Sequence, residues 1–179
     1  MKRVAALILV LLAGGIALSA ADRIFTNPKP EGHFKKLFPN AVAFSSFGGN
    51  PPHYTAYAAD PKTNPSAPVL GYIFWTTDMV PQEHGYHGAI HILVGLNLNG
   101  TINNVVVDYD SEPYGYFSVE PQEFADQFKG KSIFDKFQPG TDVDAVSRAT
   151  LSINSATRAI RDSSRIVARA LLDPNAVKR

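Results

Sequence analysis

The chain has 179 residues, of which 45% are hydrophobic and 18% are charged, and its 17 basic and 16 acidic residues give a formal net charge of +1. This composition indicates a folded domain and excludes a disordered, collagen-like or coiled-coil chain. The lack of cysteine excludes disulfides, iron–sulfur ligation and cysteine-ligated zinc, and the small net charge gives no overall basic field for nucleic-acid binding.

The N-terminal residues have the pattern of an export signal. Lys2 and Arg3 precede an uncharged run of 18 residues over 4–21, and Asp22 follows it. Such a run is either a cleaved signal peptide or a membrane anchor, because its length just suffices to span a bilayer as a helix. In both cases the positive-inside rule predicts that the rest of the chain lies on the periplasmic side of the inner membrane. The predicted division is a signal peptide or anchor over 1–21, a linker over 22–32, one domain over 33–173 and a tail over 174–179.

Three segments after residue 68 have the composition and periodicity of β-strands. The first, over 69–77, is rich in aromatic and β-branched residues. The second, over 90–96, alternates in a way that predicts a strand with one face buried more deeply than the other. Asn99 and Gly100 separate it from the third, over 101–109, and this dipeptide predicts a type I′ hairpin.

The sequence also predicts three helices, two short ones over 33–38 and 121–128 and a long one over 151–172. One face of the long helix is apolar and consists of Ile153, Ala156, Ile160, Val167 and Leu171. The opposite face is basic and consists of Arg158, Arg161, Arg165 and Arg169. Strands followed by helices predict an α+β fold, in which helices flank an antiparallel sheet and one N-terminal hydrophobic segment precedes it.

Charge is unevenly distributed along the chain. Residues 63–128 contain eight acidic and no basic residues, whereas residues 145–179 contain seven basic and two acidic ones. These regions are either an ordinary solvated sheet rim and a solvated arginine face, or surfaces that dock a charged partner.

Residues 144–150, with the sequence DAVSRAT, lie immediately before the long helix. Free backbone N–H groups at a helix start, together with the helix dipole, form a site that suits a phosphate. Asp144 or Ser147 would equally serve as a plain N-cap without any ligand. The spacing alone leaves both interpretations open.

The run DAVSRATLS resembles the Asp-x-x-Ser-Gly-Ala-Thr signature of the FMN-binding domain family, in which the last Thr carries FMN through a phosphoester bond. The segments GYIFWTTDMVP, HGAIHILVGLNLNGTINNVVV and FADQFKGKS also resemble this family, so that the likeness covers roughly residues 33–172. Within the family, the chain is most similar to the exported flavin domain of nitrous oxide reductase regulator-type proteins. It is also similar to the FMN subunits of Rnf and sodium-pumping NADH:quinone reductase complexes.

The resemblance implies that FMN is the cofactor and that a separate flavin transferase attaches it to Thr150, with FAD as the donor. The other cofactor-binding residues that it implies are Asp144, Ser147, Ala149 and Glu112, and Arg148 is added to them because a guanidinium group recognises phosphate oxygens. The chain departs from the family pattern at Arg148, where the family usually has Gly, and after Glu112, where a Thr is missing before the proline. Arg148 is expected either to pair with the FMN phosphate or to hinder the transferase.

Three histidines lie close together in the sequence but are not predicted to bind a metal, because the glycines between them argue against a helix that would align them: His84, His87 and His91. Four aromatic residues are candidates to stack on a flavin ring and equally for ordinary packing: Trp75, Tyr86, Tyr114 and Tyr116. The sequence has no G-x-S-x-G motif of a hydrolase.

Together these features predict a membrane-associated electron-transfer flavoprotein on the periplasmic side, a subunit of a membrane redox complex rather than a stand-alone enzyme. The expected partners are the flavin transferase, a membrane redox protein or quinone-linked complex, and the membrane itself through the N-terminal segment, but not nucleic acid. The alternative is a flavin-free structural or regulatory module that docks such a complex through the acidic region or the arginine face.

Overall fold

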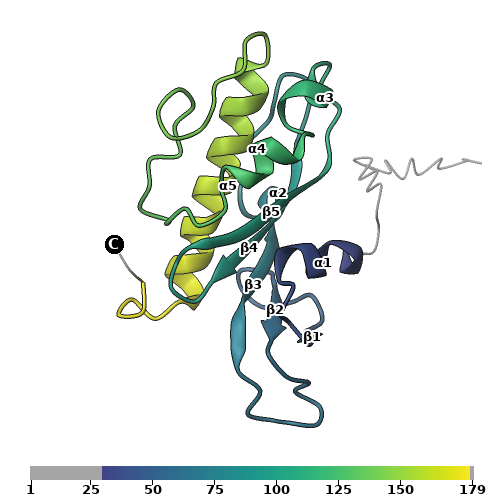
Figure 1. Ribbon diagram of the computed structural model, residues 1–179, viewed down its shortest axis with the longest axis vertical. Helices are drawn as coiled ribbons and strands as arrows, with labels where there is room; N and C mark the ends of the chain where they lie inside the picture. The colour runs from purple at the N-terminus through teal and green to yellow at the C-terminus, as the bar shows by residue number, and fades with distance from the viewer. Residues whose placement is uncertain (1–29, 178–179) are drawn as a thin grey trace, which may run out of the picture.

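The structure is a computed structural model and describes residues 30–177 (Figure 1). Five strands form one antiparallel sheet in the order β1-β2-β3-β4-β5, which confirms the predicted α+β class. The strands are β1 (Ala43–Phe44), β2 (Tyr54–Tyr57), β3 (Val69–Trp75), β4 (His91–Asn97) and β5 (Ile102–Tyr109). The helices are α1 (Glu31–Leu37), α2 (Thr76–Met79), α3 (Gly115–Ser118), α4 (Gln122–Asp126) and α5 (Thr150–Leu171). The predicted N-terminal hydrophobic segment lies outside the described residues.

Helices cover both faces of the sheet (Figure 1). On one face α5 packs against the side chains of Ile92, Val94 and Leu96 in β4, and α4 packs against β5 within the same core. On the other face α1 packs against Leu93 of the same strand. The prediction that β4 has one more deeply buried face is therefore wrong, because Leu93 is as fully buried as its neighbours. Because helices pack on both sides of β4, its two faces do not differ in burial as they would in a two-layer fold.

The β4–β5 hairpin is where the sequence predicts it, but its turn is not of type I′. A type I′ turn needs positive φ at both central residues, and of Asn99 and Gly100 only Gly100 has it, with a φ of 79°. The N–H of Gly100 donates to the carbonyl of Asn97 at 3.0 Å, and the N–H of Asn97 donates to the carbonyl of Thr101 at 2.9 Å. This pattern is typical of a three-residue loop in which glycine follows a type I turn and forms a bulge.

The predicted helices are present with small shifts at their ends. The first begins at Glu31 rather than at residue 33, and the last begins at Thr150 and ends at Leu171. The first predicted strand ends at Trp75 instead of residue 77, because Thr76 starts the short helix α2 and is fully buried there. No helix within residues 30–177 is long and apolar enough to cross a membrane.

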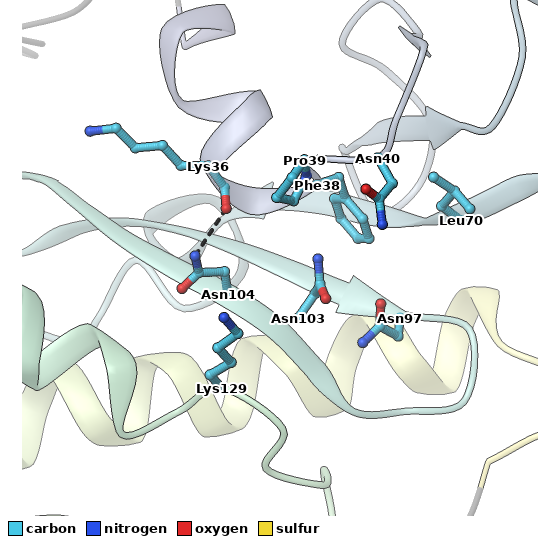
Figure 2. Close-up of a pocket in the computed structure, with 9 residues that line it drawn as sticks. All are labelled: Lys36, Phe38, Pro39, Asn40, Leu70, Asn97, Asn103, Asn104 and Lys129. Carbon is cyan, nitrogen blue, oxygen red and sulfur yellow. Dashed lines mark hydrogen bonds between the residues drawn. The ribbon is translucent and has the colours of Figure 1, made fainter.

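Polar contacts fix α1 to the last strand of the sheet. Asn104 of β5 donates to the carbonyl of Lys36 at 2.9 Å, as Figure 2 shows. His33 of α1 lies 2.7 Å from a carboxylate oxygen of Asp108, which is also in β5. A cavity of about 290 Å³ lies beside this junction and is lined mainly by asparagine and lysine. The N-terminal helix is therefore held at a defined place on the sheet.

Candidate functional site

The long helix α5 begins without a side-chain cap. Ala149 occupies the N-cap position and is 3% exposed, whereas Thr150, the next residue, is exposed. The suggestion that Asp144 or Ser147 caps this helix is wrong, because the backbone turns at Arg148, with a φ of 70°, and becomes helical only beyond it. Within residues 30–177, the first N–H groups of α5 thus have neither an intrahelical nor a side-chain acceptor.

A cavity of about 490 Å³ opens at this end of α5. It is lined by Tyr86, Pro113, Tyr114, Arg148, Ala149, Thr150, Leu151 and Ser152. Three residues of the predicted site, Arg148, Ala149 and Thr150, therefore lie together at one cavity. Tyr86 and Tyr114 join them from two other loops and supply aromatic walls. The size is within the range of cavities that bind small organic molecules.

Other candidates lie outside the cavity lining. Asp144 and Ser147 are exposed on the segment that leads to α5, and the N–H of Asp144 donates to a side-chain oxygen of Gln127 at 2.6 Å. Among the aromatic candidates, Tyr116 is 69% exposed, and Trp75 belongs to the core on the α1 side of the sheet. Trp75 is thus a packing residue, which was the second of its two predicted roles.

Glu112 lies behind the cavity and joins two of its walls. Its carboxylate accepts hydrogen bonds from the N–H groups of Tyr86 and His87, both at 2.8 Å, and of Gly88 at 3.3 Å. The hydroxyl of Ser152, in the first turn of α5, donates to the same carboxylate. Glu112 is 7% exposed, so this buried group holds the Tyr86 loop against the start of α5. Its contacts make it a positioning residue.

The hydrogen bonds decide the charge state of Glu112. Burial alone would raise the pKa of its carboxyl, but the donors, Ser152 first among them, outweigh burial and hold the pKa below its ordinary value. Gly85 leaves the room that this arrangement needs, since a Cβ there would lie 2.6 Å from the Glu112 carboxyl carbon. Sequence reasoning missed Ser152, because no local pattern indicates a partner 40 positions away.

Arg148 occupies a backbone conformation that suits glycine. Its φ of 70° is in the left-handed region, which costs a residue with a Cβ about 1–2 kcal/mol. The Gly at this position of the resembled signature thus has a conformational reason. The Arg148 side chain is exposed and forms no hydrogen bond or ion pair within residues 30–177, so a positive charge stands unpaired at the cavity.

Arg148→Gly is expected to raise the free energy of unfolding of the flavin-free protein by about 0.5–1 kcal/mol, since relief of the backbone cost exceeds the entropy that glycine adds to the unfolded chain. Urea unfolding measures this change. Arg148→Ala is the matched control, because it removes the same charge but keeps a Cβ. Equal stabilisation by both variants would show that charge, not backbone conformation, is responsible.

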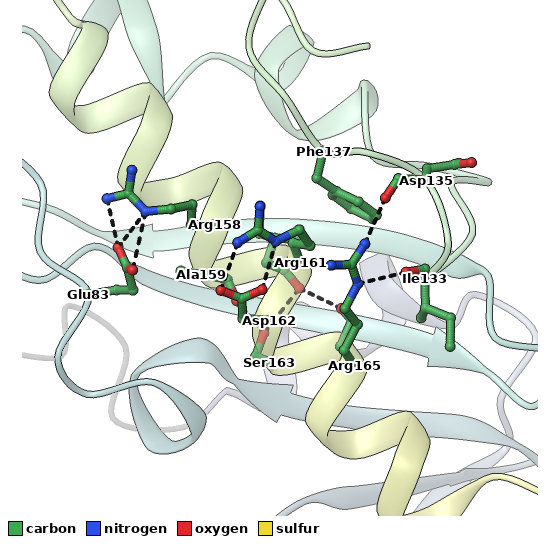
Figure 3. A network of polar contacts seen from close by, with 12 residues as sticks. Glu83, Ile133, Asp135, Phe137, Arg158, Ala159, Arg161, Asp162, Ser163 and Arg165 are labelled. Atoms are coloured by element: carbon green, nitrogen blue, oxygen red, sulfur yellow. Dashed lines mark hydrogen bonds and ion pairs between the residues drawn. The ribbon is translucent and has the colours of Figure 1, made fainter. Parts of the chain in front are cut away.

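The arginine face of α5 is largely occupied by contacts within the molecule (Figure 3). Arg158 forms a forked ion pair with Glu83, with N–O distances of 3.0–3.2 Å. Arg161 pairs with the neighbouring Asp162 at 2.7 Å. Arg165 donates to two backbone carbonyls of the loop at residues 133–135, both at 2.8 Å. Three of these arginines thus have structural roles, which weakens the interpretation of this face as a docking surface.

Arg165→Lys is expected to lower the free energy of unfolding by about 1–2 kcal/mol, because one ammonium group cannot reproduce the two-pronged contact with the carbonyls of Ile133 and Asp135. Chemical denaturation measures the loss. Arg158→Lys is the comparison, since its more exposed pair with Glu83 contributes at most about 1 kcal/mol. Similar losses in both variants would contradict the structural role of Arg165.

The three histidines do not form a metal site in the described part of the chain. Within residues 30–177 no group of three or more His, Asp or Glu side chains is arranged to hold a metal ion. His87 instead lies beside Ser111, with 3.4 Å between its ring nitrogen and the hydroxyl oxygen, and its backbone takes part in the Glu112 contact.

Comparison with known proteins agrees with the resemblance seen in the sequence. Residues 85–164 match the FMN-binding domain family. This stretch contains β4, β5, Glu112 and Thr150, and it lies inside the predicted domain over 33–173, whose limits stay a prediction. FMN is the cofactor that the match implies, and the family points to flavin-based electron transfer. The comparison with curated proteins found no match.

The residues at the start of α5 fit a cofactor that carries a phosphate. Thr150 supplies an exposed hydroxyl, Arg148 an exposed cation and the first turn of α5 N–H groups without a cap among residues 30–177, all at one cavity. Apolar and aromatic side chains, among them Tyr86 and Tyr114, line the remainder. This donor set suits a phosphate linked to a planar ring system.

Proposed function

We propose that the protein is a membrane-associated, periplasmic-side electron-transfer flavoprotein that carries FMN covalently on Thr150. The observation that supports this most is the position of Thr150, whose side chain is exposed at the cavity beside the exposed Arg148 and the N-terminus of a 22-residue helix. FMN, when bound, accepts electrons singly or in pairs, which suits a relay between two-electron donors and one-electron centres. The chain's own residues bind and orient it.

In this proposal the first turn of α5 and Arg148 hold the phosphate oxygens. Each contact between a charge and the helix dipole contributes about 0.3–1 kcal/mol, which is too little to retain a small soluble cofactor outside the cytoplasm. Tyr86 and Tyr114 flank the ring system, and Glu112 keeps Tyr86 in place through the backbone of its loop. Asp144 and Ser147, on the exposed segment before Arg148, are residues that the flavin transferase recognises.

The covalent bond needs a separate enzyme. A threonine hydroxyl is a weak nucleophile unless a base or metal activates it, and within residues 30–177 no side chain forms a hydrogen bond with the Thr150 hydroxyl. With FAD as the donor, the Thr150 oxygen bonds to the phosphorus of the FMN half, AMP leaves and the hydroxyl proton is released. The protein is thus a substrate of a flavin transferase.

The uncharged run over 4–21 supports export and attachment to the membrane, and the near-neutral remainder suits a subunit that docks by specific contacts rather than by a strong field. The proposed electron partner is a membrane redox protein or quinone-linked complex. The alternative, a flavin-free docking module, draws its support from Arg148, which departs from the glycine of the resembled signature.

In-gel flavin fluorescence of the denatured full chain separates these two functions. The chain is coexpressed with a flavin transferase, exported, denatured and run on a gel, and the Thr150 peptide is then analysed by mass spectrometry. Fluorescence that survives denaturation, with the FMN mass on that peptide, is the expected result. A chain without bound flavin would contradict the covalent proposal and favour the docking module.

A further inference from the structure

An apolar patch lies beside the first turns of α1, on the edge strand β1. Val42 and Phe47 flank β1 and are 63% and 45% exposed. Between them and α1 lies a groove of about 670 Å³, whose lining includes Phe44 and Tyr54. We refer to Val42, Phe44, Phe47 and Tyr54 as the β1 patch. Isolated exposed apolar residues are common on protein surfaces, but these four share one groove.

The structure holds the β1 patch in its exposed position. The ring centroid of Phe47 lies 4.9 Å from that of Tyr54, and Tyr54 in turn packs on the buried Phe34 of α1 at 4.6 Å. Two backbone hydrogen bonds between Gly48 and His53, at 2.8 and 3.1 Å, close the loop that follows Phe47. Because Phe34 already fills the core beneath, Phe47 stays at the surface.

We propose that the β1 patch contacts the lipid surface of the membrane, as a second attachment beside the N-terminal segment. This rests on the proposed membrane attachment through residues 4–21. Only residues 22–30 separate that run from α1, which begins at Glu31 on the rim of the groove. Nine residues, even fully extended, span about 30 Å. Glu31, on the rim of the groove, therefore lies within about 30 Å of the bilayer surface whenever residues 4–21 span it, so the groove is able to reach that surface.

The chemistry of the β1 patch fits the interface between lipid headgroups and acyl chains. Tyrosine concentrates in this zone of membrane proteins, where its ring is partly buried and its hydroxyl stays hydrated, and phenylalanine is among the apolar residues that surface-bound segments insert there. Glu31 and Lys35 both line the groove, so their charges offset each other. Apolar burial rather than attraction to anionic lipid is thus the driving force, and zwitterionic lipid suffices.

This contact orients the domain. In Figure 1, β1 lies in the lower half of the molecule, whereas α3 and the start of α5 lie at its upper end. With β1 against the membrane, the cavity at Thr150 is directed away from the bilayer. The proposed flavin site then stays open to an electron partner that approaches from the periplasm or from a neighbouring subunit.

Tryptophan quenching by brominated lipid tests the proposal on the full chain. Phe47→Trp is reconstituted into phosphatidylcholine vesicles with brominated or ordinary acyl chains, and the ratio of the two emissions is measured. Phe134→Trp is the matched control, because Phe134 is 50% exposed and belongs to a different loop. The native Trp75 is 7% exposed and adds the same background to both variants. Emission from Phe47→Trp is expected to fall in brominated vesicles, and emission from Phe134→Trp to stay unchanged.

Several results would overturn the proposal. One is unquenched Phe47→Trp in a chain that sediments with the vesicles, and another is equal quenching of both variants. A spectral shift of Phe47→Trp that depends on protein concentration without lipid would identify a second copy of the chain as the occupant instead. If the chain fails to sediment with vesicles, the membrane premise falls, and in-gel flavin fluorescence of the same sample shows separately whether the flavin function stands. Val42→Trp repeats the test if Phe47→Trp misfolds.

Discussion

Thr150→Val is expected to abolish the covalent FMN on the chain completely while the protein remains folded. Valine has nearly the shape of threonine but lacks the hydroxyl oxygen, which is the atom that forms the phosphoester. Because Thr150 is exposed, the substitution leaves the core unchanged, and surface changes of this kind alter stability by at most about 0.5 kcal/mol. Intact-protein mass spectrometry after coexpression with a flavin transferase measures the loss.

Two further variants make this result specific. Thr150→Ser keeps a hydroxyl at the same position and is expected to retain part of the modification. Thr141→Val, at another exposed threonine that precedes α5, is expected to retain all of it. A full FMN mass on Thr150→Val would place the bond on another residue, and loss of flavin from Thr141→Val as well would indicate a general defect in folding or export.

The sequence predicts the number and type of the major elements better than their surroundings. Asn99 and Gly100 mark the hairpin correctly, because a glycine with positive φ serves both a type I′ turn and a type I turn with a bulge. The sign of φ at Asn99 separates the two, and this sign depends on how the strands pair. Similarly, the helix over 33–38 is recognisable, but its packing on Leu93, which buries the second face of β4, is a tertiary contact without a local signal.

At the candidate site, too, the sequence predicts the residues that are local to one segment but not the contacts that the fold creates. Arg148, Ala149 and Thr150 are contiguous, so a sequence motif is sufficient to find them, and the structure brings them to one cavity with Tyr86 and Tyr114. The role of Glu112 is different. Its partners are 24–26 positions before it and 40 positions after it, and only the fold brings them to one carboxylate. Glu112, expected to contact the cofactor, is shown by these hydrogen bonds to hold the walls of the cavity together.

Glu112→Gln is therefore expected to be the most destabilising single change at the site, with a loss of about 2–4 kcal/mol in the free energy of unfolding at pH 7. The amide keeps the shape of the carboxyl but replaces one acceptor oxygen with an NH2 group. That group then faces backbone N–H donors, either those of His87 and Gly88 or that of Tyr86. Ser152 can rotate its hydroxyl to accept a hydrogen bond, whereas a backbone N–H has no such freedom.

The loss should depend on pH in a defined direction. A carboxyl whose pKa is lower in the folded than in the unfolded chain stabilises the fold at pH values above its unfolded pKa of about 4.3, and this contribution disappears as the pH falls through the folded pKa. The difference between wild type and Glu112→Gln is thus largest near pH 7 and narrows below about pH 4. Burial raises the pKa of Asp110, so its contribution to stability changes with pH in the opposite direction. Because wild type and Glu112→Gln both contain Asp110, comparing them at the same pH removes most of this contribution.

Urea unfolding of both proteins between pH 3 and pH 8 provides the measurement. Glu120→Gln is the matched control: Glu120 is an exposed carboxylate, and its substitution is expected to change stability by no more than about 0.5 kcal/mol. A pH-independent difference in stability between wild type and Glu112→Gln would show that the shape rather than the charge of residue 112 stabilises the cavity walls.

The flavin content of Glu112→Gln tests the positioning role separately. If Glu112 only positions the Tyr86 loop, the folded variant should still acquire covalent FMN on Thr150, but with a more exposed flavin. A folded Glu112→Gln that remains unmodified would instead assign this carboxylate to recognition by the transferase.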